Sequence, residues 1–99
     1  MNITKTEEGL VAQLAGRLDT AASVHFAAEM QPLLDSAKEH IILDMTELTF
    51  ISSSGLRHLL TLCKASHAAG GKVTLRNVNN DVMQVLRLTG FDKLFTIVE

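Results

Sequence analysis

Short apolar runs along the chain predict its strands. They lie at residues 3–6, 10–14, 40–44, 72–78 and 94–98. Only a three-residue turn separates the first two runs, so these strands must be antiparallel. The run at 40–44 is unbroken and contains β-branched residues, which predicts a central strand covered on both faces and ending at Asp44. The predicted sheet therefore has four to five strands.

Between these runs, three segments carry apolar residues at helical spacing. They are residues 21–37, residues 54–69 and the segment that begins at Val82 and is closed by Gly90. The first segment contains Pro32, which predicts a bend or an early break because proline removes a backbone donor. The apolar stripe of the second consists of Leu56, Leu59, Leu60, Cys63 and His67. Asparagine and aspartate at residues 79–81 are expected to cap the third.

The order of strands and helices predicts an α/β fold with a mixed, mostly parallel sheet packed with three or more helices. Strand–helix–strand units are almost always right-handed and give parallel neighbours. Ligands and partners of such sheets tend to meet the edge where the strands have their carboxyl ends. Two loops should lie on this edge, namely residues 16–20 and the serine-rich segment 52–55.

Length, charge and composition limit the classes of protein. The 99 residues suit a single domain, residues 1–99. The formal net charge is −2 and the basic residues are scattered, which argues against direct nucleic-acid binding. There is no apolar run of about 20 residues and no signal-peptide pattern, so we expect no membrane insertion and a cytoplasmic location. A lone cysteine, Cys63, fits a reducing compartment and is expected to be a small core residue.

The serine triplet Ser52, Ser53 and Ser54, followed by Gly55, is the main candidate site. A serine oxygen can accept a hydrogen bond from a first-turn amide, so one of the three is expected to be the N-cap of the helix. A cap needs only one hydroxyl. The others would stand at the positive end of a helix dipole, which is a natural seat for a phosphate.

Catalytic and metal-binding patterns are poorly represented. The triplet lacks the preceding glycine of a nucleophile elbow, and the four histidines have no metal-ligand spacing. We therefore expect no enzymatic activity, no metal and no cofactor. Structural roles are expected elsewhere: Phe50 and Leu56 as core anchors, and Asp44 as a strand-end residue.

Three segments in order carry a family resemblance: Gly-Arg-Leu-Asp at 16–19, Ile-Leu-Asp-Met-Thr at 42–46, and Phe-Ile-Ser-Ser-Ser-Gly-Leu at 50–56. Together they resemble the STAS domain, named for sulfate transporters and anti-sigma factor antagonists, over essentially the whole chain. In stand-alone antagonists of this family, the first serine of an Asp-Ser-Ser-Gly-Leu motif is phosphorylated. The resemblance places that acceptor at Ser53, which leaves Ser54 as the expected N-cap, whereas Ser52 stands where the family has its aspartate.

The resemblance implies a bacterial partner-switching protein. Unphosphorylated protein would bind an anti-sigma factor that is also a serine kinase and so release a sigma factor to regulate transcription, and a PPM-type phosphatase would reverse the modification. The implied partner-binding residues are Asp19, Ser52, Ser53, Ser54, Gly55 and Arg57. Loss of the acid at Ser52 leaves three alternatives open: a different kinase, weaker phosphorylation, or an acceptor moved to Ser52. Asp19 is equally well explained as an N-cap. An alternative function is a STAS subunit of a membrane-associated assembly, such as a lipid-transport ABC ATPase, which binds without phosphorylation.

Overall fold

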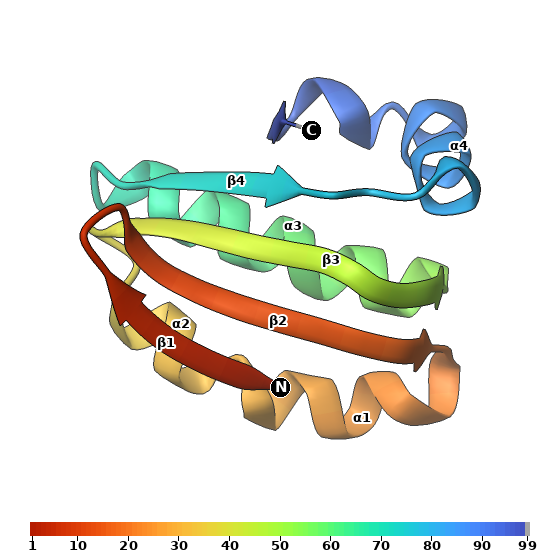
Figure 1. Cartoon of the computed structure of the whole chain (residues 1–99), viewed down its shortest axis with the longest axis horizontal. Coiled ribbons are helices and arrows are strands. Elements are labelled where there is room, and N and C mark those ends of the chain that lie inside the picture. The colour runs from red at the N-terminus through yellow and green to blue at the C-terminus, as the bar shows by residue number, and fades with distance from the viewer. Residues whose placement is uncertain (99) are drawn as a thin grey trace.

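A five-stranded mixed sheet forms the centre of the molecule, as a computed structural model describes it for residues 1–98 (Figure 1). The strands are β1 (Asn2–Thr6), β2 (Gly9–Leu18), β3 (His40–Ile51), β4 (Lys72–Arg76) and β5 (Thr96–Val98), and they lie in this order across the sheet. The helices are α1 (Thr20–Glu29), α2 (Gln31–Asp35), α3 (Ser53–Ala68), α4 (Asn80–Thr89) and the short 3-10 helix η1 (Phe91–Lys93). β1 is antiparallel to β2, and every other neighbouring pair is parallel. The predicted α/β fold is confirmed.

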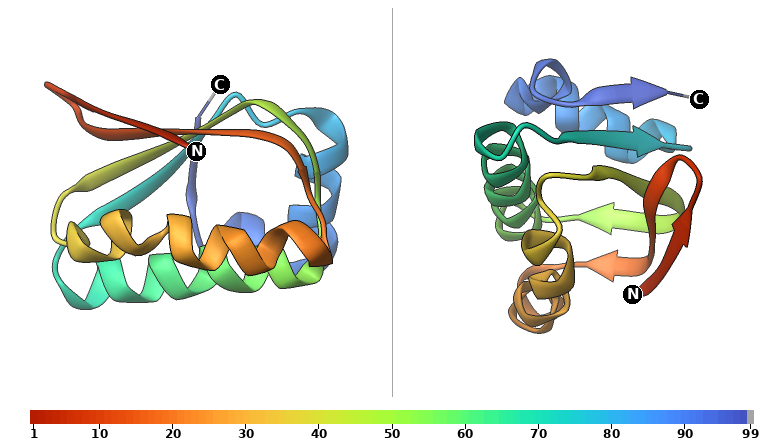
Figure 2. Two further views of the ribbon diagram at one scale, coloured as in Figure 1. Left: turned by 90° about the horizontal axis from the view of Figure 1, so that it is seen from below. Right: turned by 90° about the vertical axis from the view of Figure 1, so that its left-hand side faces the viewer.

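Helices α1, α2 and α3 cover one face of the sheet (Figure 2). The central strand is buried on both faces, as predicted, because Ile41, Ile42 and Leu43 are all at most 2% exposed. On the helix side, Leu43 lies in register between Ala12 of β2 and Leu75 of β4, and all three are fully buried. None of the helices within residues 1–98 is long and apolar enough to cross a bilayer.

Both inner strands are longer than predicted. β3 does not end at Asp44 but continues to Ile51, and β2 continues beyond residue 14 to Leu18. Two register shifts in the β2–β3 pair insert extra residues on β3, so the strands stay paired although the alternation of their side chains is broken. The burial of Leu48 and Ile51 on the helix side stabilises this extension.

The other element boundaries follow local chemistry. The predicted break at Pro32 is confirmed, since α1 ends at Glu29 and Pro32 lies in the first turn of α2, where its missing donor costs nothing. Gly90 closes α4 in a left-handed conformation, as predicted. β4 ends two residues early because Asn77 adopts a φ of 59°, which leaves the extended region.

The buried face of α3 differs from the predicted stripe. It consists of Gly55, Leu56, Leu59, Leu62 and Ser66, whereas Cys63 is half-buried and His67 is exposed. Leu56 is a core residue, as predicted. Cys63 packs against the core but is only half-buried, so its predicted place on the buried stripe is wrong. Its thiol lies at the edge of the helix, where Sγ donates to the Leu94 carbonyl at 3.3 Å and burial raises the pKa of the thiol.

Candidate functional site

The two predicted loops meet where β2 and β3 end (Figure 1). Leu18 lies beside Ile51 in the sheet, and the next amide, Ser52 N–H, donates to the Leu18 carbonyl at 2.8 Å. Helix α1 begins two residues after Leu18, and α3 begins two residues after Ile51. We call this surface, residues 17–20 and 50–57, the carboxyl rim.

Ser52 is the N-cap of α3. Its backbone is extended, with φ −88° and ψ 169°, and its Oγ accepts from the Gly55 amide at 3.2 Å. The prediction that Ser54 is the cap is wrong. Because β3 runs on to Ile51, Ser52 is the single residue between strand and helix, and Ser53 and Ser54 already belong to the first helical turn.

The three hydroxyls differ in exposure. Ser53, the first residue of α3, is exposed, whereas Ser52 and Ser54 are half-buried. One turn further along, Arg57 is also exposed. The first turn of α3 contains no acidic residue. This end of the helix therefore combines an accessible hydroxyl, a positive helix dipole and a guanidinium group.

Asp19 has a structural role on the same rim. Its Oδ1 accepts from the Ala22 amide at 2.9 Å and so caps α1. The carboxyl group is half-buried. The N-cap role weighed for Asp19 is confirmed, and its contact with a partner stays a prediction.

Gly55 lies beneath the rim, where it is buried. A Cβ atom at this position would stand 2.9 Å from Cγ and Cδ2 of Leu18 and 3.0 Å from Cγ1 of Ile51. Such distances are below van der Waals contact, so the glycine allows α3 to approach the ends of β2 and β3. Its place in the implied partner-binding set is therefore explained by packing, since it positions Ser53 and Arg57.

An arginine–aromatic pair on the rim was missed by sequence reasoning. The guanidinium carbon of Arg17 lies 4.4 Å from the ring centroid of Phe50, opposite it in the sheet. Phe50 is 36% exposed, so its prediction as a core anchor is wrong. The register shift that inserts Thr49 turns Phe50 away from the face that buries Leu48, although the two residues are two apart.

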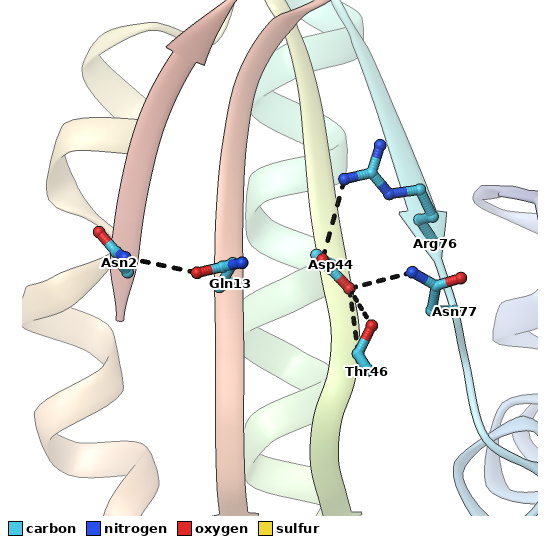
Figure 3. Close-up of polar contacts among 6 residues, drawn as sticks. All are labelled: Asn2, Gln13, Asp44, Thr46, Arg76 and Asn77. Atoms are coloured by element: carbon cyan, nitrogen blue, oxygen red, sulfur yellow. Dashed lines mark hydrogen bonds and ion pairs between the residues drawn. The ribbon is translucent and has the colours of Figure 1, made fainter.

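Asp44 organises a polar cluster on the sheet face opposite the helices (Figure 3). Its Oδ1 accepts from the Thr46 hydroxyl at 2.6 Å, the Thr46 amide at 3.1 Å and Asn77 Nδ2 at 3.3 Å, and Arg76 Nη2 lies 3.8 Å from Oδ2. The Thr46 hydroxyl is the main group that lowers the pKa of Asp44, which keeps the carboxylate ionised. Asp44 is thus a mid-strand residue, and the prediction of a strand end is wrong.

A groove of about 950 Å³ follows the edge of β2. β1 pairs with β2 only as far as Gln13, so the rest of β2 has no strand on that side. Charged and polar side chains that line the groove include Arg17, His25, Glu29 and Glu47. Within residues 1–98, no three His, Cys, Asp or Glu side chains are grouped as metal ligands would be.

Comparison with known proteins gives related sequences and structures. Residues 1–99 match the family described as the STAS domain. The anti-sigma F factor antagonist of Paenibacillus polymyxa is 31% identical over 91 residues, which are 91% of this chain and 78% of that protein. A Thermotoga maritima structure gives a TM-score of 0.89 at 20% identity, over 99% of this chain and 85% of the other.

Two solved forms of the Bacillus protein SpoIIAA, an anti-sigma factor antagonist, are similar to this chain. The unphosphorylated form gives a TM-score of 0.79 at 25% identity, over 99% of this chain and 87% of SpoIIAA. The phosphorylated form gives a TM-score of 0.72 at 23% identity, over 99% and 90%.

Proposed function

This chain belongs to the STAS domain family, and from that membership we propose that it is an anti-sigma factor antagonist controlled by phosphorylation of Ser53. The unmodified protein binds an anti-sigma factor that is also a serine kinase, and a sigma factor is released. The kinase transfers the γ-phosphoryl group of ATP to Ser53 Oγ, which loses its proton, and ADP leaves. A PPM-type phosphatase restores the hydroxyl by hydrolysis, and the chain itself catalyses neither step.

One observation carries the choice of Ser53. Ser52 supplies the cap of α3, so the exposed Ser53 hydroxyl is not needed to hold the helix and can be modified without loss of that cap. The family has an aspartate at the position of Ser52. Serine and aspartate are about equally good N-caps, so the replacement keeps the local structure that presents Ser53.

The physical basis of the switch is that the charge of a phosphate affects docking much more than it affects the stability of the fold. A phosphoserine carries a charge of about −1.5 to −2 at neutral pH. At a helix N-terminus a negative group is stabilised by about 0.3 to 1 kcal/mol, so the modified protein stays folded. Across an interface, like charges that face each other cost several kcal/mol. Phosphorylation therefore prevents docking while the domain remains intact.

The test uses the purified chain with the anti-sigma kinases of its native host and ATP. Intact-mass measurement is expected to show one added phosphate on the wild type and on Ser52→Ala, and none on Ser53→Ala. Ser53→Asp is expected to bind the kinase more weakly than the wild type, while Ser53→Ala binds normally. A phosphate on Ser53→Ala, or capture of membrane ATPase subunits in place of a kinase, would contradict the proposal and favour the non-phosphorylated STAS subunit.

A further inference from the structure

Arg57 is placed to respond to a modification of Ser53. The two residues are four apart on α3, and both are exposed. Residues at this spacing are neighbours on a helix, with about 5–6 Å between their Cβ atoms. The Cα–Cβ bond of a helical residue is tilted toward the N-terminus, so the side chain of Arg57 extends from the turn above toward the turn that holds Ser53.

The guanidinium of Arg57 lacks a counter-charge among the described residues. The ion pairs of residues 1–98 are the Met1 ammonium with Glu29, Lys5 with Glu39, and Arg76 with Asp44. Helix α3 itself contains neither aspartate nor glutamate. An arginine in this position adds its charge to the positive end of the helix dipole, and an anion is the complement of both.

We propose that the charge state of Ser53 decides which anion Arg57 binds. It binds a carboxylate of an acidic segment of the partner while Ser53 is unmodified, and it pairs with the phosphate of Ser53 once that group is present. The inference rests on the proposed function. Charge complementarity selects the partner's chemistry, since Arg57 is an exposed cation one turn from Ser53 on a helix that carries no acidic residue.

Pairing of Arg57 with the phosphate changes the surface charge that the partner meets in two ways. A guanidinium can hold a phosphate through two parallel hydrogen bonds, so a phosphate on Ser53 removes the cation that a carboxylate would use. The same phosphate presents negative charge to that carboxylate. Docking is lost through local charge alone, and no movement of α3 is required.

The pairing of Arg57 with phosphorylated Ser53 is tested without any partner. Phosphoserine is incorporated at position 53 by genetic code expansion, and its second ionisation is followed by phosphorus NMR in the wild type, Arg57→Ala and Lys64→Ala. Exposed ion pairs are weak, so the phosphate pKa is expected to be about 0.1 to 0.7 pH units lower in the wild type than in Arg57→Ala. Lys64→Ala, on the same helix face, should match the wild type. Equal titration in all three proteins would overturn the pairing.

The contact of Arg57 with the partner is tested with unmodified protein and whichever anti-sigma kinase phosphorylates the wild type in the test of the proposed function. Arg57→Ala is expected to weaken binding about tenfold and Arg57→Glu considerably more, whereas Lys64→Glu changes it little. Replacing the facing carboxylate of the partner by arginine should restore binding to Arg57→Glu. If wild type and Arg57→Ala bind equally, the inference fails while the proposed function stands. If the wild type binds no anti-sigma kinase, the proposed function itself fails.

Discussion

The starts of α1 and α3 are built alike and differ in charge. Each follows a strand end on the carboxyl rim, and each has an extended cap residue that accepts from the amide three residues later, at 2.9 Å for Asp19 and 3.2 Å for Ser52. Each first helical residue, Thr20 or Ser53, is an exposed hydroxyl. Because Asp19 is acidic and Ser52 is not, the α1 end is already balanced by a carboxylate, whereas the α3 end is not.

The difference continues one turn further along. Five residues after the cap, α1 has Val24, which is 71% exposed, and α3 has the exposed Arg57. Three residues after the cap, α1 has Ala22 and α3 has Gly55. The same cap architecture therefore serves as a plain helix start in α1 and as a tightly packed, cationic one in α3. This comparison explains why two exposed hydroxyls on one rim are not equivalent.

Copying the alanine of α1 into α3 should have the largest effect. Gly55→Ala is expected to destabilise the domain by about 1–2 kcal/mol, because the new methyl group overlaps Leu18 and Ile51. Alanine is otherwise the better helix former by about 1 kcal/mol. Urea denaturation measures the difference, with Thr61→Ala on the exposed side of α3 as the control. A Gly55→Ala protein more stable than the wild type would show that α3 can move away from the strands.

Removing either cap should cost a similar, smaller amount. Asp19→Ala and Ser52→Ala are each expected to lower the free energy of unfolding by about 1 kcal/mol, since each frees one first-turn amide from its acceptor. Ser52→Asp should keep the free energy of unfolding close to that of the wild type, because aspartate also caps a helix. Thermal and urea denaturation of these three variants and of Ser54→Ala check this. If Ser54→Ala lowered the free energy of unfolding more than Ser52→Ala does, Ser54 would be the cap.

One added negative charge at the start of each helix should affect stability differently in α3 and in α1. Ser53→Asp is expected to be neutral or stabilising, by up to about 0.5 kcal/mol, because it meets the dipole and Arg57. Thr20→Asp places its charge beside Asp19, so repulsion offsets the gain from the dipole. The measurement is the difference in denaturation midpoint between the two variants. Equal midpoints would mean that the charge of the cap does not distinguish the two ends.

The smallest effect is expected from acid, which should weaken an amide hydrogen bond to a carboxylate but not one to a hydroxyl. The Thr46 amide donates to Asp44, and the Gly55 amide donates to Ser52. The folded pKa of Asp44 is lowered, so its contribution is present above the ordinary pKa and is lost as the pH falls through the lowered value. Hydrogen exchange, corrected for intrinsic rates, should therefore show that the Thr46 amide loses protection as the pH falls below the ordinary pKa of an aspartate, whereas the Gly55 amide keeps its protection. Asp44→Asn should remove the pH dependence.

Much of this molecule could be read from local patterns. The approximate positions of the helices, the break at Pro32, the Gly90 stop and the placement of both candidate loops on one rim were all predicted and are confirmed. These features depend on backbone restrictions and on periodic burial, which neighbouring residues determine largely by themselves. The cap was predicted as a residue type, but it was assigned to Ser54 instead of Ser52.

Only the tertiary structure decided which residues the rim presents. Extra residues on β3 keep it paired with β2 as far as Ile51, and this pairing makes Ser52 the cap and turns Phe50 outward beneath Arg17. The physical reason is that a strand continues when its partner strand and a buried face support it, and neither is visible in a run of polar and apolar letters. The sequence determined that a serine would cap α3 and that others would be left over. Packing against β2 determined that Ser53, one turn before Arg57, is the exposed one.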